Sequence, residues 1–270
     1  MSLILCRQEP VASPYFVEEL GVHLYSSQEL NYVIYHHPLL VMEDFVNERL
    51  AAFLRTELRL PFLAERIQKW IQSRGASDEL LFLILQDCAF YTQAEQAAYR
   101  QKVTGLRKLS SHEYEKKRAD YFYSLGLYGR SASMYKRILD NGEGRSLSHE
   151  FRGKVWNNLG ACYAELFCFQ KAMNAYACAW NEKPEAGYLK GMYFLTKLDP
   201  ELSMKDRCRE LLASQDTEGW DREFNEALVR AGQTGPAVRL QEIFDRDPEK
   251  RLEGAAKVLN QWKLEYRKML

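Results

Sequence analysis

The stretch GKVWNNLGACYAELFCFQKAMNAYACAWNEKPEA, residues 153–186, carries large and small side chains at fixed intervals. Its first half places four side chains at spacings of three and four, which put them on one helix face: Trp156, Leu159, Gly160 and Tyr163. A second helical segment follows with Ala172, Tyr176 and Ala179. We expect Gly160 and Ala172 to be small because the two helices cross there, since overpacking such a contact costs about 1–3 kcal/mol. Trp156 and Tyr176 are expected to fill the remaining volume.

This pattern resembles the tetratricopeptide repeat (TPR), a helix–turn–helix unit of roughly 34 residues. Every signature position through Pro184 holds the expected residue or, at Tyr176 in place of Phe, a close relative. The resemblance implies an all-α protein, a TPR-like α-solenoid of antiparallel helix pairs. It also implies a concave face built from the first helix of each pair, which in this family binds a peptide or a partner segment.

Three further windows resemble the unit less closely: residues 112–145, 187–216 and 217–250. In the first of these, Tyr135 takes the place of Tyr176 and Ser131 that of Ala172, but Glu115 stands where Trp is expected. The last has Pro236 in place of Ala. We therefore expect a mainly helical N-terminal region of unknown type over residues 1–110, TPR-like repeats over 111–250 with the best unit at 153–186, and a C-terminal capping helix over 251–270.

The N-terminal region departs from the helical pattern in its first 25 residues. The segments LILCR (residues 3–7) and GVHLY (residues 21–25) each suit a short strand. Ser26 and Glu29 fit a capping box that opens a helix, and Pro38 ends that helix near His36 and His37. A metal site at the two histidines is not expected, because adjacent residues do not share a helix face.

The last helix carries apolar side chains at alternating spacings of three and four: Leu252, Ala255, Leu259, Trp262, Tyr266 and Met269. A capping helix that covers the open face of the final repeat explains this stripe. The alternative is a seam that binds a partner, although a stable coiled coil needs about three or more heptads and this helix has fewer.

The family lines its groove with fixed positions of each first helix, and the resemblance transfers this role to residues of the two best units. The candidate partner-binding residues are Lys116, Lys117, Asp120, Tyr123, Lys154, Asn157, Asn158, Ala161 and Glu165. Asn side chains suit a peptide backbone because they both donate and accept hydrogen bonds. The alternative for each residue is a solvated face without a ligand.

One subclass of the family clamps a C-terminal carboxylate with converging cations and amides. Here Lys116 and Asn158 match that pattern, whereas Asp120, Tyr188 and Met192 do not. Asp120 would repel a carboxylate, and such a clamp depends on convergent positive charge. A carboxylate clamp is therefore not expected.

Composition limits the partner class. The 270 residues hold 37 Lys+Arg and 37 Asp+Glu, so the net charge is zero and nothing global attracts nucleic acid or anionic lipid. The N-terminal apolar run is too short for a signal peptide, and no stretch reaches the roughly 20 apolar residues of a membrane span. These features favour a cytoplasmic location without a membrane partner. A basic run between Arg100 and Arg118 is interrupted by Glu113 and Glu115, which favours a solvated face over a nucleic-acid site.

No phosphate-binding glycine loop, nucleophile motif or metal-ligand spacing occurs in the sequence. We therefore expect no catalysis and no cofactor. The predicted function is a protein–protein interaction adaptor or assembly scaffold. The alternative is a peptide-sensing regulator that acts on a nucleic-acid-binding or enzyme partner; residues 60–75 come closest to the helix-turn-helix that would favour it. The sequence leaves open the partner, the pathway, the role of residues 1–110 and the oligomeric state.

Overall fold

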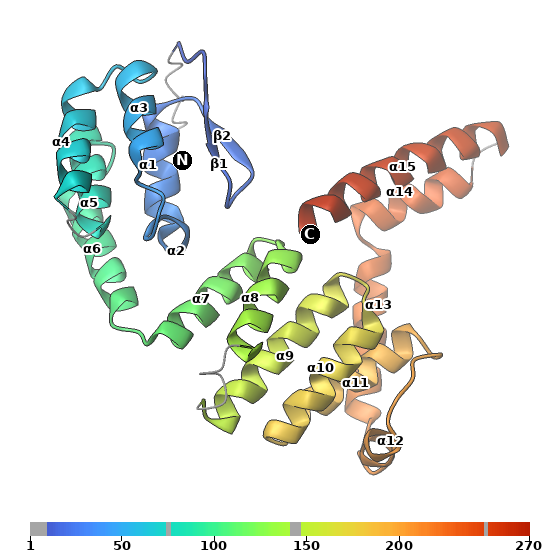
Figure 1. Cartoon of the computed structure of the whole chain (residues 1–270). Coiled ribbons are helices and arrows are strands. Elements are labelled where there is room, and N and C mark those ends of the chain that lie inside the picture. The colour runs from blue at the N-terminus through green and yellow to red at the C-terminus, as the bar shows by residue number, and fades with distance from the viewer. Residues whose placement is uncertain (1–9, 74–76, 141–146, 246–247) are drawn as a thin grey trace. The chain divides into compact units, whose positions relative to one another are not determined.

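The structure is a computed structural model that describes residues 10–73, 77–140, 147–245 and 248–270. Over this part the chain is almost entirely α-helical, apart from one two-stranded hairpin. Contacts divide it into two units, Met1–Tyr114 and Glu115–Leu270, and the division falls inside helix α7 (Ser111–Ser124). Figure 1 shows the elements of both units.

The first unit begins with an antiparallel hairpin of β1 (Tyr15–Val17) and β2 (Val22–Leu24), in which Tyr15 pairs with Leu24. Strand β2 lies within the predicted GVHLY segment. The predicted LILCR strand lies outside the described residues, and β1 was not predicted. The helices of this unit are α1 (Ser27–His36), α2 (Pro38–Val41), α3 (Glu48–Thr56), α4 (Pro61–Gln72), α5 (Ser77–Cys88) and α6 (Gln93–Arg107).

The predicted cap of α1 is confirmed. The Glu29 amide donates to Ser26 Oγ at 3.1 Å, and the Glu29 carboxylate accepts from the Tyr25 amide at 2.6 Å. The helix ends at His36, two residues before Pro38, which starts α2. The first bond satisfies an amide that a helix start leaves without a partner. The carboxylate bond reaches the amide of Tyr25, one residue before the Ser26 amide that a complete capping box would use.

The core of the first unit lies between the hairpin and helices α1 to α6. Helix α3 has the apolar face that the 3.6-residue period predicts, and it buries Leu50, Phe53 and Leu54. Helices α4 and α5 contribute Ile67 and Ile84. This core gives the N-terminal region its own stability, because each buried aliphatic side chain contributes about 1.5–3 kcal/mol.

The second unit continues from α7 through α8 (Tyr128–Asp140), α9 (His149–Glu165), α10 (Phe169–Glu182), α11 (Ala186–Leu198), α12 (Asp206–Ala213), α13 (Glu218–Gly232), α14 (Gly235–Phe244) and α15 (Pro248–Met269). Helices α8 to α11 lie side by side in chain order, with α9 packed between α8 and α10 (green to yellow in Figure 1).

The turn after α7 and the turn after α9 have the same hydrogen-bond pattern. The Leu127 amide donates to the Phe122 carbonyl at 3.0 Å, and the Cys168 amide donates to the Tyr163 carbonyl at 2.8 Å. One residue in each turn has a positive φ: Gly126 at 75° and Phe167 at 57°. Equivalent side chains beyond the turns are buried alike: Ser131 with Ala172, Tyr135 with Tyr176, and Ile138 with Ala179. The two helix pairs therefore repeat one local structure.

Gly160 lies where a neighbouring ring leaves no room for a side chain. A Cβ at this position would lie 2.8 Å from Tyr176 Cε1. The close approach of α9 and α10 predicted at Gly160 is thus present, and its partner is the Tyr176 ring. Ala172, the other small residue, is fully buried.

The predicted face of α9 is corrected in part. Trp156 and Tyr163 are only half-buried, whereas the helix buries Val155, Leu159 and Cys162. The reason is that α9 packs against α8 on one side and α10 on the other, so its apolar surface is wider than one stripe. Trp156 therefore does not fill the core as expected.

The C-terminal helices are packed more loosely. Helix α13 has no buried residue and α14 buries only Ile243. Pro236, which the sequence aligned with an Ala of a second helix, instead lies in the first turn of α14. A backbone N–H in that turn has no acceptor within the helix, so Pro loses no hydrogen bond there. On α15 the predicted capping stripe is mostly exposed, including Leu252 and Leu259.

Candidate functional site

Helices α7 and α9 bring several of the predicted binding residues into one hydrogen-bonded row. Residues four apart lie on the same helix face, so Lys116 and Asp120 are neighbours on α7. Lys116 Nζ lies 2.9 Å from Asp120 Oδ2. From α9, Asn158 Nδ2 donates to Asp120 Oδ1 at 3.0 Å. The Asp120 carboxylate therefore joins the two helices.

Tyr135 of α8 contacts both Asp120 and Asn158 of this row. Its hydroxyl donates a short hydrogen bond to Asp120 Oδ1 and accepts from Asn158 Nδ2 at 3.3 Å. Burial, followed by the bond to Asp120, raises the pKa of Tyr135 well above its usual value. The hydroxyl is protonated at neutral pH, and Asp120 accepts hydrogen bonds from Lys116, Tyr135 and Asn158.

Asn157 extends the row toward solvent. Its Nδ2 donates to Asn158 Oδ1 at 3.1 Å, and both side chains are half-buried. Within the part of the chain that the structure describes, no donor contacts Asn157 Oδ1. The row therefore ends in an accessible carbonyl acceptor, which can take a hydrogen bond from a ligand amide.

A second pair joins the C-terminal ends of α7 and α9. The Tyr123 hydroxyl lies 3.3 Å from Glu165 Oε1, and the Tyr123 ring packs edge-on against Tyr128 with centroids 5.1 Å apart. Burial and the nearby Glu165 carboxylate raise the pKa of Tyr123. Ala161 is half-buried one turn before Glu165 on α9.

The remaining predicted residues lie at the margins. Lys154 is exposed and pairs with Glu150 at 2.7 Å along α9. Lys117 is exposed on α7. Exposed pairs of this kind contribute about 0–1 kcal/mol, so Lys154 remains available to a ligand.

The carboxylate clamp rejected from the sequence does not fit the geometry either. Lys116, one of its two matching residues, is already paired with Asp120. Tyr188 and Met192, which would have to be replaced by cations in a clamp, are buried in the core of the second unit. A ligand carboxylate at Lys116 would compete with a carboxylate of the same helix.

Tyr135 is the functional candidate that sequence reasoning missed. Its position predicted a packing ring, equivalent to Tyr176, and the ring is buried as predicted. A buried Tyr hydroxyl normally finds a polar partner, which is the signal that pointed to a polar group nearby. The pattern alone did not identify Asp120 as that partner.

Other kinds of site were sought over the described residues. No group of three or more His, Cys, Asp or Glu side chains in that part of the chain could hold a metal ion. No helix there is both long enough and apolar enough to cross a bilayer. Comparison of the chain with family models, curated proteins and solved structures finds no match.

Proposed function

We propose that this chain is a TPR-type scaffold that binds an extended segment of a partner protein, without catalysis, on the surface formed by α7 and α9. The observation that carries the proposal is the row Lys116–Asp120–Asn158–Asn157, which links the predicted groove positions of two successive helix pairs. The equivalent turns and buried residues of the two pairs support the repeat interpretation.

The chemistry of this row favours binding over catalysis. Asp120 accepts bonds from Lys116, Tyr135 and Asn158, so its charge is compensated and its oxygens are occupied. A general base must instead reach the proton it removes. Fixed side chains suit recognition, because a ligand then binds without the cost of ordering them, about 0.5–1.5 kcal/mol for each flexible side chain.

An extended peptide matches the groups that remain accessible. Asn157 offers a carbonyl acceptor, Lys154 an exposed cation and Tyr123 an aromatic surface beside Glu165. Peptide backbones present alternating donors and acceptors, and Asn can satisfy both. We infer that backbone recognition by Asn157 provides affinity, and that Tyr123 and Lys154 select the ligand side chains.

Selection from a random displayed peptide library on the purified full chain tests this function. Selected peptides are then measured by fluorescence anisotropy against wild type, Asn157→Ala and Lys136→Ala. Lys136 is an exposed residue of α8 outside the row and provides the control. We expect Asn157→Ala to weaken binding about tenfold, the loss of roughly one good hydrogen bond, and Lys136→Ala to leave it unchanged. Peptides that bind both variants as tightly as wild type would contradict the assignment of this surface.

A further inference from the structure

Helix α15 presents an apolar stripe to solvent. Leu252, Leu259 and Trp262 are 78%, 50% and 43% exposed, although their spacing places them on one face. An amphipathic helix normally buries such a stripe, and exposed apolar patches mark binding surfaces. The packing of α15 within the second unit thus leaves a face that another element can cover.

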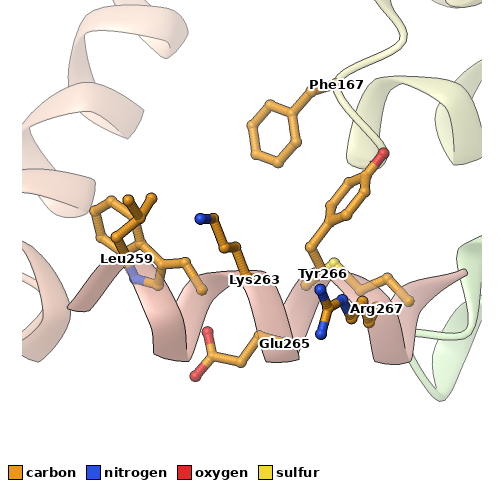
Figure 2. A pocket seen from close by; sticks show the side chains of 8 residues that line it. Phe167, Leu259, Lys263, Glu265, Tyr266 and Arg267 are labelled. Carbon is orange, nitrogen blue, oxygen red and sulfur yellow. The ribbon is translucent and has the colours of Figure 1, made fainter. Parts of the chain in front are cut away.

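One end of this stripe is closed into a pocket by the α9–α10 turn. The Tyr266 hydroxyl donates to the Leu166 carbonyl at 3.3 Å, which places α15 against that turn. The resulting pocket has a volume of about 560 Å³, and Phe167 forms its wall opposite the helix. In Figure 2, Phe167 faces the side of α15 from which Lys263 and Tyr266 project, whereas Glu265 points away.

Phe167 occupies a backbone position that disfavours its own side chain. Its φ of 57° lies in the left-handed region, and the equivalent residue of the preceding turn is Gly126, which adopts such angles without steric cost. The Phe167 side chain is nevertheless 71% exposed, so core packing does not account for it. Strained backbone positions cluster at active sites and ligand-binding segments.

We infer that the stripe of α15 together with Phe167 binds an amphipathic helix of a partner protein, with acidic residues flanking the apolar face of that helix. The positive charge of the pocket favours a partner helix with acidic residues. Lys263 and Arg267 line the pocket, and over the described residues neither has an acidic partner. Glu265 also lines the pocket, but its carboxylate accepts from Gln261 at 2.8 Å and points away from Phe167. Acidic side chains of a docked helix would compensate the two cations.

Two other occupants fit less well. A second copy of α15 packed in parallel would place its own Lys263 and Arg267 against these cations. A lipid surface is flat on this scale and would leave the pocket beneath Phe167 unfilled. A side chain projecting from a partner helix fills it, as in other helix-in-groove complexes. This surface shares no residue with the α7–α9 row, so the inference does not rest on the function proposed above.

The test uses a displayed library of amphipathic helical peptides that carry Leu and Phe on one face and either Glu or Lys beside it. The bait is the full chain. We expect Glu-flanked peptides to be enriched, with micromolar affinity in anisotropy measurements. Lys263→Glu should weaken binding at least tenfold, since it reverses the charge at the pocket. Lys257→Glu is the matched control, because it makes the same charge change on the opposite face of α15.

Phe167→Gly separates loss of binding from loss of folding. Gly suits the left-handed backbone, so this variant keeps the turn and removes only the pocket wall; we expect at least a tenfold loss of peptide affinity. Enrichment of Lys-flanked peptides, or of none, would overturn the inference. So would a wild-type dimer in sedimentation that Leu259→Glu dissociates, or co-sedimentation with anionic vesicles that Lys263→Glu abolishes while peptides fail to bind.

Discussion

The ring of Tyr176 lies so close to Gly160 that a single added carbon at Gly160 would come within 2.8 Å of it. The backbone of α9 and the Tyr176 ring of α10 meet at this contact. Replacing Gly160 by Leu therefore forces the helices apart or the ring out of the core. We expect Gly160→Leu to lower the free energy of unfolding by about 1–3 kcal/mol, measured by thermal denaturation followed by circular dichroism.

Gly187 supplies the control for this substitution. It lies in α11, and a Cβ built there meets no atom within 4 Å. Gly187→Ala should leave the melting temperature equal or higher, because Ala favours helix by up to about 1 kcal/mol. If Gly160→Leu melts at the wild-type temperature, the contact with Tyr176 does not exist in solution.

Phe167, the left-handed residue of the α9–α10 turn, gives a substitution that we expect to raise the free energy of unfolding. A non-glycine residue in this conformation costs about 1–2 kcal/mol, and Gly loses up to about 1 kcal/mol more chain entropy on folding. Phe167→Gly should therefore raise the free energy of unfolding by up to about 1 kcal/mol. In the equivalent turn, Gly126→Ala should lower it by a similar amount. Chemical denaturation of both variants measures the pair, and equal destabilisation by both would refute the strain argument.

The free energy of unfolding of the first unit should depend on pH because of His37. Burial, together with the neighbouring His36 and Lys102, lowers the pKa of His37 below its usual 6.5. The neutral form is thus favoured in the folded state, so its contribution to stability is full above pH 6.5 and is lost as the pH falls through the folded pKa. We expect the free energy of unfolding to fall between about pH 7.5 and pH 5.5, a range in which most carboxylates stay ionised.

His37→Gln removes the titrating ring, so it shows how much of the pH dependence of the free energy of unfolding comes from His37. The variant should lose less stability than wild type over the same pH interval, because an amide does not gain a proton. Urea denaturation at the two pH values measures the difference. An unchanged slope in the variant would assign the pH dependence to other groups.

The positions of several helices and of the small residue Gly160 were predictable, because they depend on the spacing of residues along the chain. The face of α3 and the cap at Ser26 follow from three- and four-residue intervals alone. The close approach at Gly160 was predicted from its small size within the repeat pattern, whereas its contact with the Tyr176 ring was not. Strand β1 was missed, since three residues after Pro14 provide too short a pattern.

Features that depend on tertiary neighbours were not predictable. The burial of Val155 and Cys162 arises because α8 and α10 contact α9 on two sides. The period of α15 indicates an amphipathic helix, but it does not specify whether the same chain covers the stripe; here Leu252 stays exposed. Likewise, the repeat resemblance predicted that Asp120 and Asn158 line a binding surface, but it did not predict that the Tyr135 hydroxyl contacts both of them from α8.

The Tyr135 hydroxyl both stabilises the folded chain and orients Asp120 in the candidate binding surface. Tyr135→Phe keeps the buried ring and removes the donor to Asp120. A hydrogen bond to a charged group contributes about 1.5–3 kcal/mol, so the free energy of unfolding should fall by an amount in that range. The freed Asp120 oxygen would also leave Asn158 less firmly oriented.

Tyr176→Phe is the matched control, because Tyr176 is the buried equivalent of Tyr135 in the next helix pair. No hydrogen bond of its hydroxyl is found within the described residues, and loss of that hydroxyl should change stability by less than about 0.5 kcal/mol. Urea denaturation compares the two variants. A loss of the same size in both variants would mean that the hydrogen bond from Tyr135 to Asp120 does not stabilise the folded state. The row between α7 and α9 would then not depend on Tyr135.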